Sequence, residues 1–200
     1  MNMFRLAAVA AFALSSVTAS AQTTVKIGFI TSYSGLNGNL GPYMERAVRL
    51  YLKQHEKELG GVKVELITRD DTGPNPDKAR QLAQELVVRD KVNLLAGVIF
   101  TPNAMAIAPI ATEAKVPFVI MNAGTAVITT RSPYMVRTSF TLWQSTYPLG
   151  QWASKKFKTG YTLVSDFGPG HDSEEGFSKG FEEGGGKVLS KVRVPLQNPD

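Results

Sequence analysis

The sequence predicts an α/β fold built on a doubly wound parallel sheet. Short apolar segments of strand length alternate with longer segments of helical periodicity, and loops rich in Gly, Asn, Thr and Asp follow the apolar segments. Such alternation is typical of βαβ units, whose right-handed crossovers bring the loops after the strands to one edge of the sheet. A ligand of such a sheet binds at that edge.

The first part of the chain, residues 22–140, supplies most of the predicted sheet. Its expected strands are 25–30, 62–68, 92–97 and 118–121, and its helices begin at Pro42, Asn75 and Asn103. Apolar residues recur on one face of each helix. These inward faces comprise Met44, Ala47, Val48, Tyr51, Leu52, His55 and Leu59, then Ala79, Leu82, Ala83, Leu86 and Val87, then Ala104, Ile107, Ala108 and Ala111.

Residues 94–103, L-L-A-G-V-I-F-T-P-N, place a buried strand end against a helix start. The Thr101 hydroxyl can cap this helix, and Pro102 suits its first turn, where a missing N–H costs nothing. Unpaired N–H groups and the helix dipole favour an anion there. The same layout recurs where V-P-F-V-I-M runs into N-A-G-T-A at 122–126. Two such strand ends predict a cleft for a small anionic ligand.

A second unit begins after R-S-P-Y at 131–134, which breaks the alternation. Residues 135–140 form a short strand or crossing segment, and residues 141–200 carry helices at 143–157 and after Asp172, with strands at 161–166 and 188–194. Asp172 is the expected cap of its helix, with Phe177 and Phe181 on one face. Two strands and two helices cannot bury a full core, so we expect this second lobe to be incomplete.

The pattern of the N-terminal residues is typical of an export signal. Arg5 gives a positive start, residues 6–14 an apolar core, and Ala19-Ser20-Ala21 a cleavage site. We therefore expect a signal peptide at 1–21, cleaved after Ala21, and a periplasmic protein.

Composition excludes several classes of function. The formal charge of the 200 residues is +5, and Lys155, Lys156 and Lys158 read as a solvated helix face, so no nucleic-acid partner is expected. The absence of cysteine excludes thiol catalysis, cysteine-based zinc sites and iron–sulfur clusters.

Two motifs are better explained by structure than by chemistry. Gly35, Gly38 and Gly41 have the spacing G-x-x-G-x-x-G, not the dinucleotide fingerprint G-x-G-x-x-G, and indicate a flexible turn that could line a ligand site. Asp70 and Asp71 precede T-G-P without a nearby His, so they are expected to serve the turn before a metal or acid–base role.

The two histidines and Trp143 leave alternatives open. His55 is expected to pack on a helix, whereas His171 lies beside Asp172 in a Gly/Pro loop, as a ligand contact or as part of a capped loop. No Ser stands in G-x-S-x-G to form a catalytic pair with His171. Trp143 could cover a ligand or pack the hinge.

An ordered series of segments resembles the type I periplasmic binding proteins of ABC importers, in the branch that binds Leu, Ile and Val. The series comprises I-G-F-I-T-S-Y-S-G, D-D-T-G-P-N-P-D-K-A, D-K-V-N-L-L-A-G-V-I-F-T, V-P-F-V-I-M-N-A-G-T and S-D-F-G-P-G-H-D-S-E-E-G-F. The resemblance implies a two-lobed receptor that closes on a ligand and delivers it to a membrane permease. Members of the family are roughly twice as long, which is consistent with an incomplete second lobe.

The resemblance also implies site residues. Thr101 matches a Ser/Thr that hydrogen-bonds the ligand carboxylate, and Ala123 and Thr125 match a pair that contacts the same group. Leu40 stands where an aromatic residue often packs on the ligand, and Phe167-Gly168 replaces the usual Tyr-Gly.

The sequence therefore predicts a periplasmic solute receptor without catalysis, metal or cofactor, monomeric when complete. Its ligand is expected to be a small carboxylate, first an aliphatic or branched-chain amino acid, alternatively an aromatic or other organic acid. A ligand-sensing domain and a secreted hydrolase are the rival functions. Phe100, Leu40, Trp143 and Phe167 would shape the apolar part of the pocket, and His171 and Asp172 would reach in from the second lobe.

Overall fold

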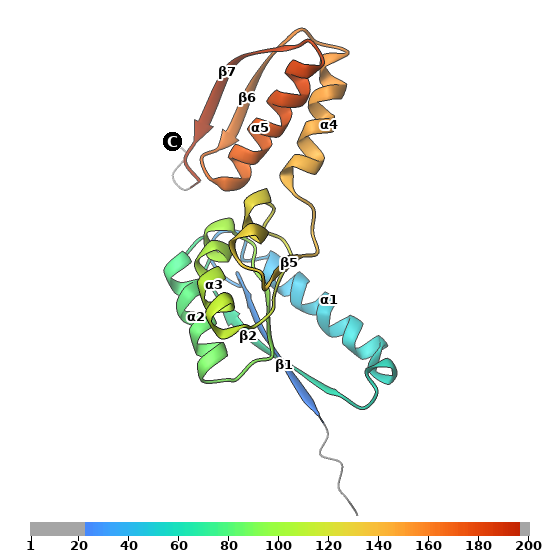
Figure 1. Cartoon of the computed structure of the whole chain (residues 1–200), viewed down its shortest axis with the longest axis vertical. Coiled ribbons are helices and arrows are strands. Elements are labelled where there is room, and N and C mark those ends of the chain that lie inside the picture. Colours follow the sequence, from blue (N-terminus) through green and yellow to red (C-terminus); the bar gives the residue numbers. More distant parts are fainter. Residues whose placement is uncertain (1–22, 197–200) are drawn as a thin grey trace, which may run out of the picture.

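The computed structural model describes residues 23–196. The expected signal peptide at 1–21 lies outside these residues. Two units follow one another along the chain and meet end to end, with the linker after β5 running between them (Figure 1). Within 23–196, no helix has the length and apolar character needed to cross a membrane.

The first unit is a five-stranded parallel sheet of order β2-β1-β3-β4-β5. This confirms the predicted parallel sheet and adds the segment around Val136 to it as a fifth strand. Because all strands run the same way, their carboxyl ends share one edge. The strands are β1 (Thr24–Thr31), β2 (Lys63–Asp70), β3 (Leu94–Gly97), β4 (Phe118–Ile120) and β5 (Met135–Arg137).

Helices α2 (Pro76–Val88) and α3 (Thr101–Ala114) pack together against the sheet and enclose its core. Asn75 caps α2, as predicted, by accepting a hydrogen bond from the Lys78 N–H at 3.1 Å. The predicted inward face of α2 is also confirmed, with Val87 partly buried. Its fully or largely buried residues are Ala79, Leu82, Ala83 and Leu86.

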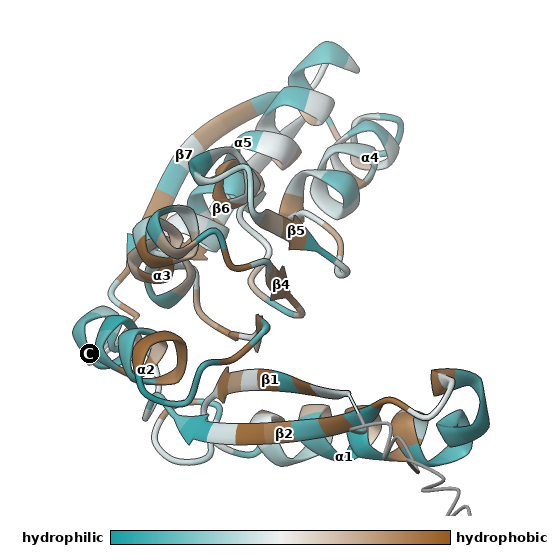
Figure 2. Cartoon of the chain, turned by 60° about the horizontal axis from the view of Figure 1, so that its bottom comes forward, coloured by the Kyte–Doolittle hydropathy of each residue, from teal (hydrophilic) through white to brown (hydrophobic). Residues whose placement is uncertain are grey.

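Helix α1 (Leu40–Gln54) lies on the other side of the sheet, and the inward face predicted for it is wrong in part. Only Gly41 is buried, while Ala47 and Tyr51 are exposed. His55 stacks on Tyr51 with ring centroids 4.1 Å apart, and a short 3-10 helix, η1 (Glu56–Leu59), follows. Helical periodicity reports an apolar face but not whether another element covers it, and α1 carries both hydrophobic and hydrophilic residues (Figure 2).

The second unit pairs two helices with a two-stranded parallel sheet, β6 (Thr159–Ser165) and β7 (Lys187–Val194). Helices α4 (Leu142–Ser154) and α5 (Gly168–Glu183) approach so closely that a Cβ on Gly150 or Gly180 would collide with the facing backbone. Tyr161 and Leu163 of β6 are each 70% exposed, so one face of this sheet is uncovered among the described residues.

Two predicted helix caps are wrong. Phe100, not Thr101, is the N-cap of α3, and it has no side-chain cap. Phe167 is the N-cap of α5, so Asp172 lies inside that helix and His171 lies in its first turn, not in a loop. In both helices Pro sits in the first turn, where its fixed φ starts the helix and its missing N–H is no loss. Phe177 and Phe181 lie on one face of α5, as predicted, and their rings stack with centroids 5.5 Å apart.

A buried carboxylate ties the strand ends to α3. Asp71 is 0% exposed and accepts hydrogen bonds from Ser32 Oγ at 2.6 Å, Asn103 Nδ2 at 2.8 Å and the Gly73 N–H at 3.2 Å. Asn103 also donates to the Gly73 carbonyl at 2.9 Å. The carboxylate lies at the N-terminal turn of α3, where the helix dipole stabilises negative charge. Beside it, Asp70 holds the turn as predicted, accepting from Ser34 Oγ at 2.6 Å.

We predict that Asp71→Ala lowers the free energy of unfolding by about 2–4 kcal/mol, because it leaves buried donors without an acceptor. Chemical denaturation would measure the change. Asp77→Ala is the matched control, since the Asp77 side chain is 93% exposed and its removal should cost less than about 0.5 kcal/mol. Equal unfolding midpoints for the two variants would contradict the structural role of Asp71.

Candidate functional site

A pocket of about 250 Å³ lies where the carboxyl ends of β3 and β4 face the start of α5. The first unit, the second unit and the linker between them all contribute to its wall. None of the lining side chains is charged, and three are phenylalanines. The lining residues are Asn37, Ile99, Phe100, Asn122, Gly124, Phe140, Leu142, Phe167 and Pro169.

The chain turns sharply at the end of β3 to form one wall of this pocket. Val98 has φ +65°, a left-handed conformation that is strained for a β-branched residue. It is held there because its N–H donates to the Ile30 carbonyl at 2.7 Å and its carbonyl accepts from the Ala123 N–H at 3.2 Å. The turn presents Phe100 to the pocket and aims the start of α3 at it.

Thr101 and Thr125 meet beside the pocket. Their Oγ1 atoms are 2.7 Å apart, and both residues are buried. The Thr101 hydroxyl thus bonds across to the loop after β4 instead of capping its own helix. Gly168 of α5 packs on this pair, because a Cβ on Gly168 would lie 2.9 Å from Thr125 Oγ1 and 3.2 Å from Thr101 Cγ2. The two predicted threonines are therefore together, and the second unit covers them.

Two other predicted contacts in the first unit lie outside the lining. Both backbone polar groups of Ala123 are engaged, the N–H by Val98 and the carbonyl by Arg137 Nη1 at 3.4 Å, while the next residue, Gly124, lines the pocket. Leu40 is the first residue of α1 and is half-buried. Asn37, three residues earlier and with φ +60°, lines the pocket in its place.

Of the residues predicted from the second unit, Phe167 lines the pocket. Trp143 packs between α4 and α5, where Lys179 Nζ lies 5.9 Å from its ring centroid. His171 lies outside the lining, and its Nε2 lies 2.7 Å from Asp166 Oδ1. Asp172 reaches the first unit, where its Oδ2 accepts a hydrogen bond from the Ala126 N–H at 2.5 Å.

Sequence reasoning missed Arg137, a cation at the end of β5 that contacts the loop after β4. Its Nη1 donates to the Thr125 carbonyl at 2.7 Å. Burial lowers its pKa from the usual value, and the Asp172 carboxylate acts in the opposite direction. A cation at the end of a sheet strand is a candidate for the site. The sequence analysis left residues 135–140 as a strand or a crossing segment, so Arg137 was not recognised as such a cation. Between residues 23 and 196, no three His, Asp or Glu side chains gather as a metal site.

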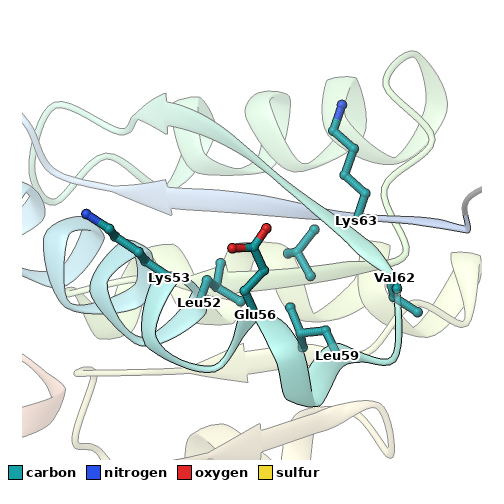
Figure 3. A pocket seen from close by; sticks show the side chains of 8 residues that line it. Leu52, Lys53, Glu56, Leu59, Val62 and Lys63 are labelled. Carbon is teal, nitrogen blue, oxygen red and sulfur yellow. The ribbon is translucent and has the colours of Figure 1, made fainter.

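A second pocket, of about 380 Å³, lies between the end of α1, η1 and the start of β2 (Figure 3). Leu52, Leu59 and Val62 form much of its lining, and the amines of Lys53 and Lys63 point away from it. It lies at the amino-terminal edge of the sheet, away from the strand ends, the helix starts and the threonine pair. We therefore place the candidate site at the first pocket, where those features converge.

Comparison with known proteins identifies the family and the fold. The Leu/Ile/Val-binding protein homolog 6 of Brucella abortus is 41% identical over 201 residues, which cover 100% of this chain and 51% of that protein. The chain thus spans about half the length of the curated relatives it matches. The family model of the periplasmic binding proteins matches residues 24–200.

Two solved solute-binding proteins of ABC transporters from Rhodopseudomonas palustris have the same fold. The protein of strain BisB5, in complex with 3,4-dihydroxybenzoic acid, is 48% identical with a TM-score of 0.84 over 88% of this chain and 49% of that one. The protein of strain HaA2, in complex with p-hydroxybenzoic acid, is 46% identical with a TM-score of 0.83 over 88% and 48%. With its parallel sheet and a family match along nearly its whole length, the chain belongs to the periplasmic binding proteins.

Proposed function

We propose that the protein is a receptor of an ABC importer whose ligand is a small aromatic carboxylate of the hydroxybenzoate class. The observation that carries this proposal is the pocket lined by Phe100, Phe140 and Phe167 without a charged side chain. The expected branched-chain amino acid becomes the second candidate. Two similar receptors of known structure, bound to hydroxybenzoic acids, support this order.

The three phenylalanines suit a flat ring. They come from different segments, the turn after β3, the linker and the start of α5, so they surround the pocket from more than one side. Offset and edge-to-face ring contacts add about 0.5–1.5 kcal/mol each to the burial of apolar area. The amides of Asn37 and Asn122 also line the pocket and offer hydrogen bonds to ring hydroxyls.

The carboxylate of the ligand would lie toward Thr101 and Thr125. The first N–H groups of α3 precede its hydrogen-bonded ladder, and the start of α5 faces the same place. The threonine hydroxyls add O–H donors, and Arg137 adds positive charge behind the loop.

An amino acid fits this lining less well. Its ammonium group needs a carboxylate or several acceptors, and no residue lining the pocket carries a carboxylate. Burying an unpaired ammonium costs several kcal/mol. The name of the Brucella relatives keeps the amino acid as the competing ligand, and the missing acceptor would have to come from elsewhere in the protein.

The remaining parts of the proposal follow from the family. The receptor would be periplasmic, would close its two lobes on the ligand and would deliver it to membrane permease subunits without chemical change. Phe100, Phe167, Thr101 and Thr125 are the proposed ligand contacts among the residues expected from sequence. His171, which pairs with Asp166 outside the lining, is not among the proposed contacts.

We predict that the complete protein binds 4-hydroxybenzoate more tightly than leucine by at least about a hundredfold, equivalent to roughly 3 kcal/mol, because the ammonium of leucine is unpaired. Isothermal titration calorimetry with both ligands would measure this. Equal or tighter binding of leucine would reject the aromatic ligand in favour of the amino acid.

We predict that Phe140→Ala weakens binding of 4-hydroxybenzoate by about tenfold, since it removes one ring contact and its buried area. Phe140 is 62% exposed, so its truncation should leave the fold intact. Phe157→Ala is the matched control, because Phe157 is 56% exposed and lies outside the pocket lining. The same affinity in both variants would exclude Phe140 from the site.

We predict that Thr101→Val with Thr125→Val weakens binding of aromatic carboxylates by tenfold or more, the equivalent of about 1.5–3 kcal/mol for hydrogen bonds to a charged group. Valine keeps the shape of threonine and removes only the hydroxyl. Thr129→Val in η2 (Ala126–Arg131) serves as the control. Unchanged calorimetric affinity in the double variant would place the carboxylate elsewhere.

A further inference from the structure

A carboxylate from the second unit crosses to the first unit beside the pocket without lining it. Asp172 Oδ2 accepts a hydrogen bond from the N–H of Ala126 at 2.5 Å. Ala126 is the first residue of η2, so its N–H lies at a helix start and has no earlier carbonyl to bond. The contact joins α5 to the loop after β4, residues 46 positions apart in the sequence.

Arg137, at the end of β5, holds the same loop from within the first unit. Its Nη1 donates to the Thr125 carbonyl at 2.7 Å and to the Ala123 carbonyl at 3.4 Å. The loop 123–126 is therefore fixed to β5 by a guanidinium and to α5 by a carboxylate. Because Arg137 is half-buried, its charge is poorly screened by water, and the Asp172 carboxylate favours its charged form.

Two other charged groups near Asp172 on α5 pair with residues outside this loop, and Glu175 is exposed. His171 pairs with Asp166, its Nε2 2.7 Å from Oδ1. Glu174 is 1% exposed and accepts from Arg193 Nη2 at 2.7 Å, a hydrogen bond that lowers the pKa of Glu174. Asp172 is thus the acidic group of this helix turn that faces the first unit.

We propose that Asp172 and Arg137 are positioning residues that set the separation of the two pocket walls, and that neither contacts the ligand. One wall is α5 with Phe167 and Pro169, and the other is the loop with Gly124. The pair acts by favouring the closed arrangement of the two units. The identity of the ligand used in the affinity test rests on the proposed function, whereas the positioning role does not.

This role has a consequence that a ligand contact would not have. A residue that shifts the equilibrium between open and closed arrangements changes the apparent affinity for every ligand of the closed form by one factor. A residue that touches one ring substituent changes affinities selectively, whereas a residue that touches the shared carboxylate changes them equally but does not alter the arrangement of the ligand-free units. Comparing several ring substitution patterns therefore excludes contact with a substituent, and a distance measurement without ligand excludes contact with the carboxylate.

The first test measures affinities of the complete protein and its Asp172→Asn variant for benzoate, 4-hydroxybenzoate and 3,4-dihydroxybenzoate by calorimetry. Asparagine keeps a hydrogen-bond acceptor but loses the charge, so we expect about tenfold weaker binding, equal for the three ligands. Glu182→Gln removes the charge of an exposed residue at the far end of α5 and should leave all three affinities unchanged. Selective loss for one ligand, or the same affinities as Glu182→Gln, would overturn the proposal.

The second test needs no ligand. Because the sequence contains no cysteine, spin labels can be attached specifically after Glu113→Cys in α3 and Lys155→Cys at the end of α4. We expect Asp172→Asn and Arg137→Gln each to shift the distance distribution between the labels to longer values, and Glu182→Gln to leave it in place. Unchanged distributions in the first two variants would overturn the positioning role.

The two tests separate the two proposals. If no aromatic acid binds the unaltered protein, the proposed function fails, and the label distances still decide the positioning role. If aromatic acids bind and both tests show no difference between Asp172→Asn and Glu182→Gln, the positioning role fails alone. In the double variant Asp172→Asn with Arg137→Gln, we expect a shift smaller than the sum of the single shifts, because both residues hold one loop.

Discussion

The geometry of the site depends on the buried carboxylate of Asp71. Asp71 directly follows β2. Its carboxylate binds Ser32, which follows β1, and Asn103, which lies in the first turn of α3. A buried charge is tolerated only when its acceptor sites are filled, so these partners cannot separate without a large cost. The network fixes where α3 begins relative to the sheet. The start of α3 places Phe100 in the pocket lining and Thr101 beside the pocket.

From this fixed point the site extends to elements that are distant in sequence. The strained turn at Val98 and the loop after β4 bring Thr101 and Thr125 together, and α5 of the second unit closes over them with Gly168. Only a residue without a side chain allows that approach. The threonine pair therefore lies at the contact between the two units, so a ligand bound there, as proposed, would couple binding to the arrangement of the units.

Sequence patterns predicted best where local rules and packing agree. The strand–helix order, the Asn75 cap and the buried face of α2 follow from periodicity and capping chemistry, and the structure confirms them. Prediction failed where another interaction or a second local signal outweighed the pattern that was used. Thr101 could cap α3, but its hydroxyl bonds to Thr125, and proline in the first turn started α5 before Asp172 could cap it. The apolar stripe of α1 is present, yet none of its residues is fully buried, and Ala47 and Tyr51 are exposed.

The sequence alone determined the fold class, the family and the edge of the sheet that holds the site, because strand–helix alternation and right-handed crossovers leave little topological freedom. Of the residues that it named for the site, Phe100 and Phe167 line the pocket, and Thr101 and Thr125 lie together beside it. The tertiary structure decided which residues line the pocket and which support it. Phe140 and Asn37 line the pocket, Arg137 supports the loop beside it, and Trp143 packs between α4 and α5. These assignments depend on contacts between segments far apart in the chain, and no local pattern encodes such distances.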